Sequence, residues 1–260
     1  MTQGIWATWY DLADGPPAAY FDWLHDHHLP QIQQRAGFAW AAHYRITGGG
    51  KRMDKIHDHL ARTGANVGTG SQYLVLVGAT SPHVFFKPRI DLWQAALTGT
   101  DAEMLALRLG ARTCFFTEEA RVTGPEYDTA VDGGCPAPAI QMGSFQTKTL
   151  DDELDLAAWY AQYRLPAMSR MPGCVASRKL VSVAGWAKHS ILYEFTSLKA
   201  RLDSFQSHES LALDDRVWTN RIINYTVHAP GSPSVGERIW PAADTGWQSS
   251  NETKDRQQWP

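Results

Sequence analysis

The chain has 260 residues, 43% of them apolar and 20% charged, a composition that argues against an intrinsically disordered protein. The formal net charge is −3 with 24 basic and 27 acidic residues interspersed, so nothing indicates binding to nucleic acid or to an anionic membrane. We therefore expect a globular protein whose partner is a small molecule. The sequence leaves open whether two copies of the chain form a homodimer.

The N-terminal sequence MTQGIWATWYDL lacks the segments of a secretory signal, which predicts a cytoplasmic protein. Cys114, Cys135 and Cys174 are odd in number and form no C-x-x-C motif, a pattern typical of reduced thiols and not of disulfides or zinc. Eleven Trp and ten His residues combine apolar bodies with polar edges. This mixture favours an aromatic-lined pocket, with a Trp-filled core as the simpler alternative.

The predicted elements follow the same order twice along the chain. In the first half we expect a strand at 5–12, a helix after Pro16 and Pro17, strands at about 38–45 and 71–79, a helical segment at 82–97 interrupted by Pro88, and a strand at 114–124. In the second half the corresponding segments are 141–148, a helix and strand within 157–180, 189–197, a helix at 197–211 and a last strand at 218–229.

An internal repeat connects the two halves. At an offset of 136 residues, FDWLHDHHLPQIQQRAGFAWAAHY at 21–44 aligns without a gap on AAWYAQYRLPAMSRMPGCVASRKL at 157–180, so that both prolines and both glycines match. The order β-α-β-β-α-β in each half is that of a ferredoxin-like unit. We predict a first unit at 1–130, a linker at 132–139, a second unit at 139–230 and a C-terminal tail at 231–260.

The motif F-x-W-x-x-x-x-H-x-P followed by Gly and an aromatic strand resembles the dimeric α/β-barrel superfamily, once in each half. The resemblance implies an α+β fold in which two tandem ferredoxin-like βαββαβ repeats form an intramolecular dimeric α/β barrel. Members of this superfamily include cyclases, lactone isomerases, quinone-forming monooxygenases, haem-dependent enzymes and proteins with no assigned activity, so the fold alone does not select a reaction. The Trp- and His-rich first half is also similar to formaldehyde-releasing lyases that act on lignin-derived aromatic dimers.

Seven of the ten histidines precede the repeat boundary, and the second copy replaces those of the first motif. At the aligned positions His25, His27, His28 and His43 become Ala161, Tyr163, Arg164 and Lys179. This asymmetry favours one active pocket in the first half and a structural second half, with sequence drift as the alternative.

Helical spacing places His28 on the inward stripe, His25 beside it and His27 toward solvent. On the next strand His43 and Arg45 share one face, whereas Trp40 and Tyr44 share the other, and the sequence leaves open which face lines the pocket.

The first half also carries an insertion of about 18 residues near 48–70, with a composition typical of a lid. It contains His57 and His59, and one of them is a candidate for contact with the site from above. On a helix the two side chains diverge by about 200 degrees, so we expect no metal there.

These residues predict general acid/base chemistry on an aromatic small molecule by a lyase or isomerase that needs no cofactor. His28 or His43 is the candidate base, and Tyr10 or Arg45 would stabilise the developing oxyanion. The side chains expected to surround the substrate are Trp6, Trp9, His25, Trp40, Tyr44, His59, Tyr73 and Phe86. The alternatives are a haem-dependent oxidoreductase or monooxygenase of the same superfamily, and a non-catalytic protein that binds an apolar ligand.

Overall fold

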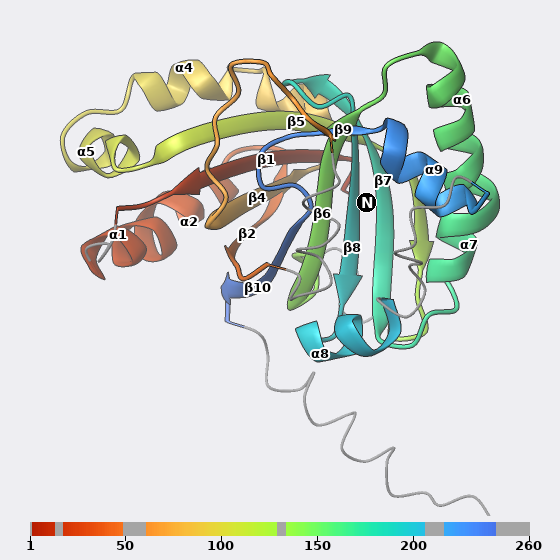
Figure 1. The fold of residues 1–260 in the computed structure, drawn as a ribbon. Helices are drawn as coiled ribbons and strands as arrows, with labels where there is room; N and C mark the ends of the chain where they lie inside the picture. The colour runs from red at the N-terminus through yellow and green to blue at the C-terminus, as the bar shows by residue number, and fades with distance from the viewer. Residues whose placement is uncertain (1, 14–17, 49–60, 129–133, 206–215, 243–260) are drawn as a thin grey trace, which may run out of the picture.

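The computed structural model describes residues 2–13, 18–48, 61–128, 134–205 and 216–242. Eight antiparallel strands form a closed barrel in the order β10-β2-β4-β1-β5-β7-β8-β6, and β6 pairs again with β10 (Figure 1). The barrel strands are β1 (Gly4–Asp11), β2 (Phe38–Ile46), β4 (Tyr73–Ala79), β5 (Leu109–Thr123), β6 (Ala139–Gln146), β7 (Cys174–Ala184), β8 (His189–Phe195) and β10 (Ser234–Trp240). The two-residue strands β3 (Ala61–Arg62) and β9 (Val227–His228) extend the sheet beside β6.

Helices cover the outside of the barrel in two separate groups, one on each side in Figure 1. The first group comprises α1 (Ala18–Asp22), the π-helix η1 (Trp23–His28), α2 (Leu29–Gln33), the 3₁₀-helix η2 (Pro82–Phe85), α4 (Ile90–Ala95) and α5 (Thr100–Ala106). The second comprises α6 (Leu150–Trp159), the π-helix η4 (Tyr160–Arg164), α7 (Leu165–Met168), α8 (Leu198–Ala200), the π-helix η5 (Arg201–Phe205) and α9 (Trp218–Tyr225). No helix in the described ranges has both the length and the apolar character needed to cross a membrane.

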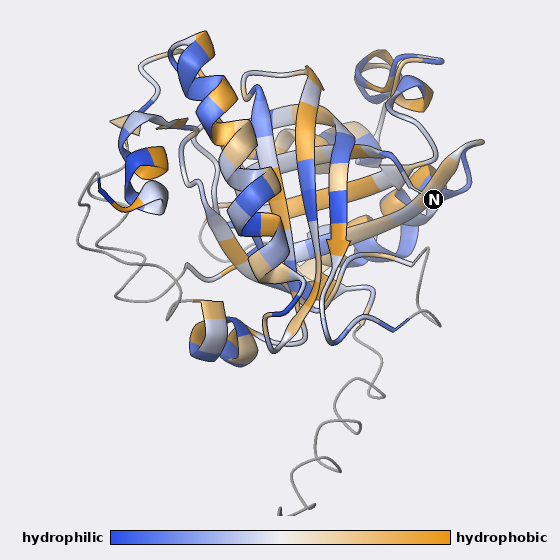
Figure 2. Ribbon diagram, turned by 90° about the vertical axis from the view of Figure 1, so that its right-hand side faces the viewer, coloured by the Kyte–Doolittle hydropathy of each residue, from blue (hydrophilic) through white to orange (hydrophobic). Residues whose placement is uncertain are grey.

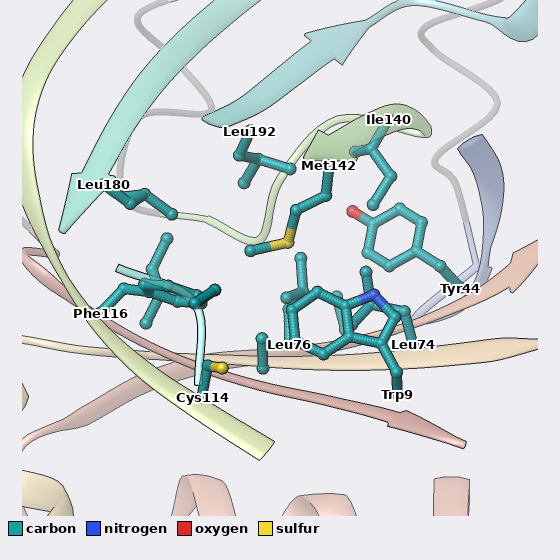
Figure 3. Close-up of a cluster of buried hydrophobic side chains, with 14 of the residues drawn as sticks. Trp9, Tyr44, Leu74, Leu76, Cys114, Phe116, Ile140, Met142, Leu180 and Leu192 are labelled. Atoms are coloured by element: carbon teal, nitrogen blue, oxygen red, sulfur yellow. The ribbon is translucent and has the colours of Figure 1, made fainter. Parts of the chain in front are cut away.

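The interior of the barrel is a packed apolar core (Figure 3). Trp9, Tyr44, Leu76, Phe116 and Met142 come from different strands and meet there, each fully buried. One further cluster lies between the sheet and each group of helices, so both faces of β1, β4, β6 and β8 are buried. This explains why hydrophobicity alone could not tell the two faces of a strand apart.

The strand order within the first half is β2-β4-β1-β5, and within the second half it is β7-β8-β6-β10. Gly37 and Gly173 precede the second strand of each half, with φ of 85° and 79°. A Cβ atom on Gly37 would lie 2.8 Å from Val84, and one on Gly173 would lie 2.6 Å from Ala200. Both glycines are therefore required by backbone conformation and by close approach to the following helical segment.

The ladders also correct the alignment of the first strands. The β1–β4 ladder and the β6–β8 ladder have the same number of residue pairs. They run from Gly4↔Ala79 to Tyr10↔Tyr73 and from Ala139↔Phe195 to Phe145↔His189. Residues of β1 therefore correspond to residues of β6 at a sequence offset of 135 instead of 136. The second half has one more residue between strand and helix, and a shift of one residue moves every side chain to the other face.

The end of the chain differs from the prediction as well. The segment predicted as a strand at 218–229 begins with helix α9, because Trp218, Ile222 and Tyr225 follow helical spacing. The eighth strand is β10, at Ser234–Trp240, inside the predicted tail at 231–260. It pairs with β2 and with β6 and so closes the barrel. Most of the predicted insertion, at 49–60 with His57 and His59, lies outside the described residues.

Candidate active site

A chain of three hydrogen-bonded side chains lies between the sheet and the first group of helices. The hydroxyl of Tyr10 lies 2.9 Å from Nε2 of His43, and Nε2 of His25 lies 2.8 Å from Nδ1 of the same imidazole. Tyr10 and His43 are completely buried, whereas His25 is partly exposed. Both ring nitrogens of His43 are therefore engaged, and the chain runs from the buried interior to the surface.

Each member of this chain is positioned by a different element. Tyr10 on β1 pairs with Tyr73 on β4. His43 on β2 pairs with Val75, which lies two residues after Tyr73 on β4. His25 belongs to the π-helix η1, which ends just before Pro30. Pro30 has no N–H to offer a helical hydrogen bond, and the widened π turn of η1 ends two residues before it.

Burial keeps the chain uncharged near neutral pH. It lowers the pKa of His43 well below the ordinary value, and repulsion from His25 and Arg108 acts in the same direction. Burial also lowers the pKa of His25, against the attraction of Asp26 and Asp22. The pKa of the Tyr10 hydroxyl is raised well above its ordinary value by burial. Neutral imidazoles can accept a proton at one nitrogen and release one at the other, so the chain can relay protons.

Aromatic rings surround the three side chains. Phe21 lies 6.0 Å from His25 and 6.2 Å from His43 between ring centroids, and Tyr73 stacks on Tyr10 at 5.6 Å. The indole of Trp240, on β10, stacks on His25 with an angle of 14° between the ring planes. The exposed member of the chain thus lies among flat apolar surfaces that suit an aromatic molecule.

Four of these neighbours were not among the predicted site residues: Tyr20, Phe21, Arg108 and Trp240. The guanidinium of Arg108 lies 4.6 Å above the Tyr10 ring and donates a hydrogen bond to Tyr20 at 3.0 Å. Phe21 and Tyr20 precede the histidine motif on the same helical segment, and this proximity is a signal that the sequence offered. Arg108 and Trp240 carry no such signal, because only the closed barrel brings them to the site.

His28 is buried, as helical spacing predicted, but it is not part of the hydrogen-bonded chain. Its ring lies between Trp23 and Trp93, at centroid distances of 4.5 and 5.7 Å. Neither ring nitrogen has a hydrogen-bond partner in the described part of the molecule. Burial, reinforced by repulsion from Arg108, lowers the pKa of His28 to about 3, so the imidazole is neutral at pH 7. His27 is exposed, as predicted.

The structure places the other predicted residues in several environments. Arg45 is exposed on β2. Trp9, Trp40 and Tyr44 belong to the barrel core, on the opposite face from His43. Trp6 faces the helices and donates a hydrogen bond to Thr8. Phe86 is partly buried and packs on Phe115 at 5.1 Å. The structure thus brings together Tyr10, His25, His43 and Tyr73, and separates from them the other predicted site residues that it describes.

Comparison with known proteins gives the class of fold. No family model and no curated protein matches the sequence. Among solved structures, an anthrone oxidase-like protein has a TM-score of 0.52 at 10% identity, covering 92% of this chain and 91% of that one. A "putative monooxygenase" from Fusobacterium nucleatum has a TM-score of 0.51 at 6% identity, covering 91% and 92%. A dye-decolorizing peroxidase from Bacteroides thetaiotaomicron has a TM-score of 0.48 at 10% identity, covering 92% and 93%.

The protein therefore has the dimeric α/β-barrel fold. The expectation of a cofactor-independent lyase or isomerase is wrong: the two structures with the higher TM-scores are named for oxidase and monooxygenase activity, and neither is described as a formaldehyde-releasing lyase.

Two buried histidines of the first half do not fit a haem group. An axial histidine needs a free nitrogen facing an open space. Both nitrogens of His43 are hydrogen-bonded, and His28 lies between two indole rings. Neither of these two imidazoles can therefore hold a haem iron.

Proposed function

We propose that this protein is an oxidoreductase of the monooxygenase type that acts on an aromatic molecule with an acidic C–H or O–H bond. The observation that carries the proposal is the hydrogen-bonded chain from Tyr10 through His43 to the partly exposed His25. His25 is the group that a substrate can reach, and it takes the role of general base. His43 and Tyr10 are positioning residues that hold its tautomer and carry the proton away from the surface.

The chemistry balances with molecular oxygen as the oxidant. His25 removes a proton from an activated CH₂ group next to an aromatic ring, and the resulting carbanion donates electrons to O₂ to form a carbon-bound peroxide. Protonation of the peroxide, loss of the second C–H proton and cleavage of the O–O bond give a ketone and one water molecule. One atom of O₂ enters the product and the other leaves as water, so no external reductant is needed.

Two features support this assignment. The lowered pKa of His25 and His43 keeps both imidazoles neutral, as a base must be before it acts. An anthrone has an acidic CH₂ group between two aromatic rings, and one of the proteins that share the fold is described as anthrone oxidase-like. The rings of Phe21 and Trp240 beside His25 suit a flat substrate of this type.

We also infer that the two halves are copies of one βαββαβ unit. The identical strand order, the matched glycines with positive φ and the π-helices η1 and η4 at aligned positions support this. The inference explains why the second half keeps the same scaffold although Ala161, Arg164 and Lys179 stand where the first half has His25, His28 and His43.

The test uses anthrone as the probe and measures O₂ consumption together with incorporation of ¹⁸O from ¹⁸O₂ into the product. We expect turnover by the natural protein, and a loss of about a hundredfold or more in His25→Ala. His27→Ala is the matched control, because His27 is exposed on the same π-helix, and it should retain activity. Equal activity of His25→Ala and the natural protein, or product oxygen derived from water, would contradict the proposal.

A further inference from the structure

The second group of helices encloses a pocket that the proposed reaction does not use. It lies between the sheet, at β6 and β8, and the helices α6, η4 and α9, and its volume is about 90 Å³. In Figure 2 these helices lie in front of the strands. A single water molecule needs only about 10–15 Å³, so the pocket has room for a molecule the size of one ring.

The pocket lies where two positions on β6 carry smaller side chains than the corresponding positions on β1. The third and fifth rungs of the β1–β4 ladder carry Trp6 and Thr8, whereas the same rungs of β6–β8 carry Gln141 and Gly143. In the first half the Trp6 indole fills the space below the helices and stacks on Phe115. In the second half the corresponding space stays open, and Gln141 and Gly143 both line it.

The wall of the pocket is mostly aromatic and aliphatic. Phe145, Trp159 and Tyr160 contribute rings, while Ile191 and Ile222 contribute branched aliphatic surface. Trp159 and Tyr160 meet edge to face at 4.8 Å, which fixes the two rings relative to each other. A flat apolar molecule is therefore the shape and polarity that this wall matches.

One polar group on the wall has a defined orientation. Gln141 is only 6% exposed, and its Oε1 accepts hydrogen bonds from Nε and Nη2 of Arg201. Because a guanidinium can only donate, the oxygen of the amide must face Arg201 and the NH₂ group must face away from it. That NH₂ group makes no hydrogen bond within the described ranges of the chain.

We propose that this pocket is a second ligand site, which takes a one-ring aromatic molecule with a carbonyl oxygen. The ring packs among Trp159, Tyr160 and Ile191, and the carbonyl oxygen accepts a hydrogen bond from the NH₂ group of Gln141. A ligand that supplies an acceptor to this NH₂ group forms one hydrogen bond more than a ligand of the same shape without an acceptor.

The experiment measures the binding of benzaldehyde and of toluene by calorimetry on the full chain. Both should bind, and benzaldehyde should bind about tenfold more tightly because of one additional hydrogen bond. Gln141→Glu keeps an acceptor for Arg201 but removes the donor, so it should reduce benzaldehyde to the affinity of toluene. Gly143→Leu should fill the pocket and abolish binding of both probes.

Two controls make the outcome decisive. Gly64→Ala should leave binding unchanged, because a Cβ atom there would meet nothing within 4 Å. His25→Ala should also leave binding unchanged, which separates this pocket from the proposed active site. The proposal is overturned if neither probe binds, if Gln141→Glu binds benzaldehyde as the natural protein does, or if His25→Ala abolishes binding.

Discussion

The fifth rung of the β2–β4 ladder carries His43, and the same rung of the β7–β8 ladder carries Lys179. His43 is held by two neutral partners, Tyr10 and His25. Lys179 instead lies 3.1 Å from the carboxylate of Glu119 and 3.2 Å from Nδ1 of His189. Burial lowers the pKa of the Lys179 amine, and Glu119 opposes this shift. One backbone position thus carries a member of a chain of neutral hydrogen-bonded side chains in the first half, and an ion pair in the second.

This difference shows how two halves with the same strand order can have different properties. A neutral imidazole can exchange protons without a change of partner, whereas a buried ammonium needs its carboxylate to remain charged. In the first half, aromatic side chains fill the space between the sheet and the helices around Tyr10 and His43. In the second half, the corresponding layer contains buried cations and an open pocket. Four predictions test the comparison.

The largest effect is expected from the matched rung itself. His43→Leu removes the imidazole that links Tyr10 to His25, and should lower kcat for anthrone oxidation by about 10²–10⁴-fold. Lys179→Leu changes the corresponding position of the second half and should leave kcat within about twofold. Steady-state kinetics on folded variants, verified by circular dichroism, measures both. A greater loss of kcat in Lys179→Leu than in His43→Leu would contradict the assignment of the reaction to the first half.

A second prediction concerns stabilisation by charge in the second half. Nε of Arg178 lies 2.7 Å from Oε1 of Glu194, with both side chains buried. Glu194→Leu leaves the guanidinium without its carboxylate and should lower the free energy of unfolding by about 3–5 kcal/mol. Asp203→Leu, which breaks the exposed pair with Lys199, should cost less than about 1 kcal/mol. Urea denaturation measures both, and equal costs would show that burial of the pair is unimportant.

The third prediction concerns the pH dependence of stability. His28 aligns with Arg164 in the second half, and an arginine does not titrate near neutral or acidic pH. The pKa of His28 is about 3 in the folded protein and near 6.5 in the unfolded chain. Between these values the unfolded state binds more protons, so stability falls as the pH falls below about 6.5. By pH 4 this group alone should cost about 3 kcal/mol.

His28→Phe removes that titration and should make the loss of stability between pH 6.5 and pH 4 smaller. Denaturation at several pH values gives the comparison with the natural protein. Parallel pH profiles for the two proteins would show that His28 is protonated without penalty in the folded state.

The smallest effect compares two aligned tryptophans. Nε1 of Trp23 donates to the carboxylate of Asp101 at 2.6 Å, and Nε1 of Trp159 donates to the hydroxyl of Thr219 at 3.3 Å. Hydrogen bonds to a charged acceptor are stronger, so Trp23→Phe should destabilise the protein by about 1 kcal/mol more than Trp159→Phe. Thermal unfolding of both variants measures the difference, and a reversed order would contradict the assignment of the stronger bond.

The sequence alone determined the order of most elements and the local constraints that fix them. The repeated glycines predicted where β2 and β7 begin, and helical spacing predicted a buried His28 and an exposed His27. These features depend on neighbours within one or two turns of the chain, so local physical chemistry is sufficient to predict them.

Only the tertiary structure decided which strand face meets which layer and which distant residues reach the site. Both faces of the strands are buried, so alternation separates His43 from Tyr44 without showing which of them faces the helices. Trp240 reaches His25 because β10 closes the barrel against β2, and Gln141 lines a pocket because α9 covers β6. Such contacts join residues far apart in the chain, and their positions follow from barrel closure and not from local pattern.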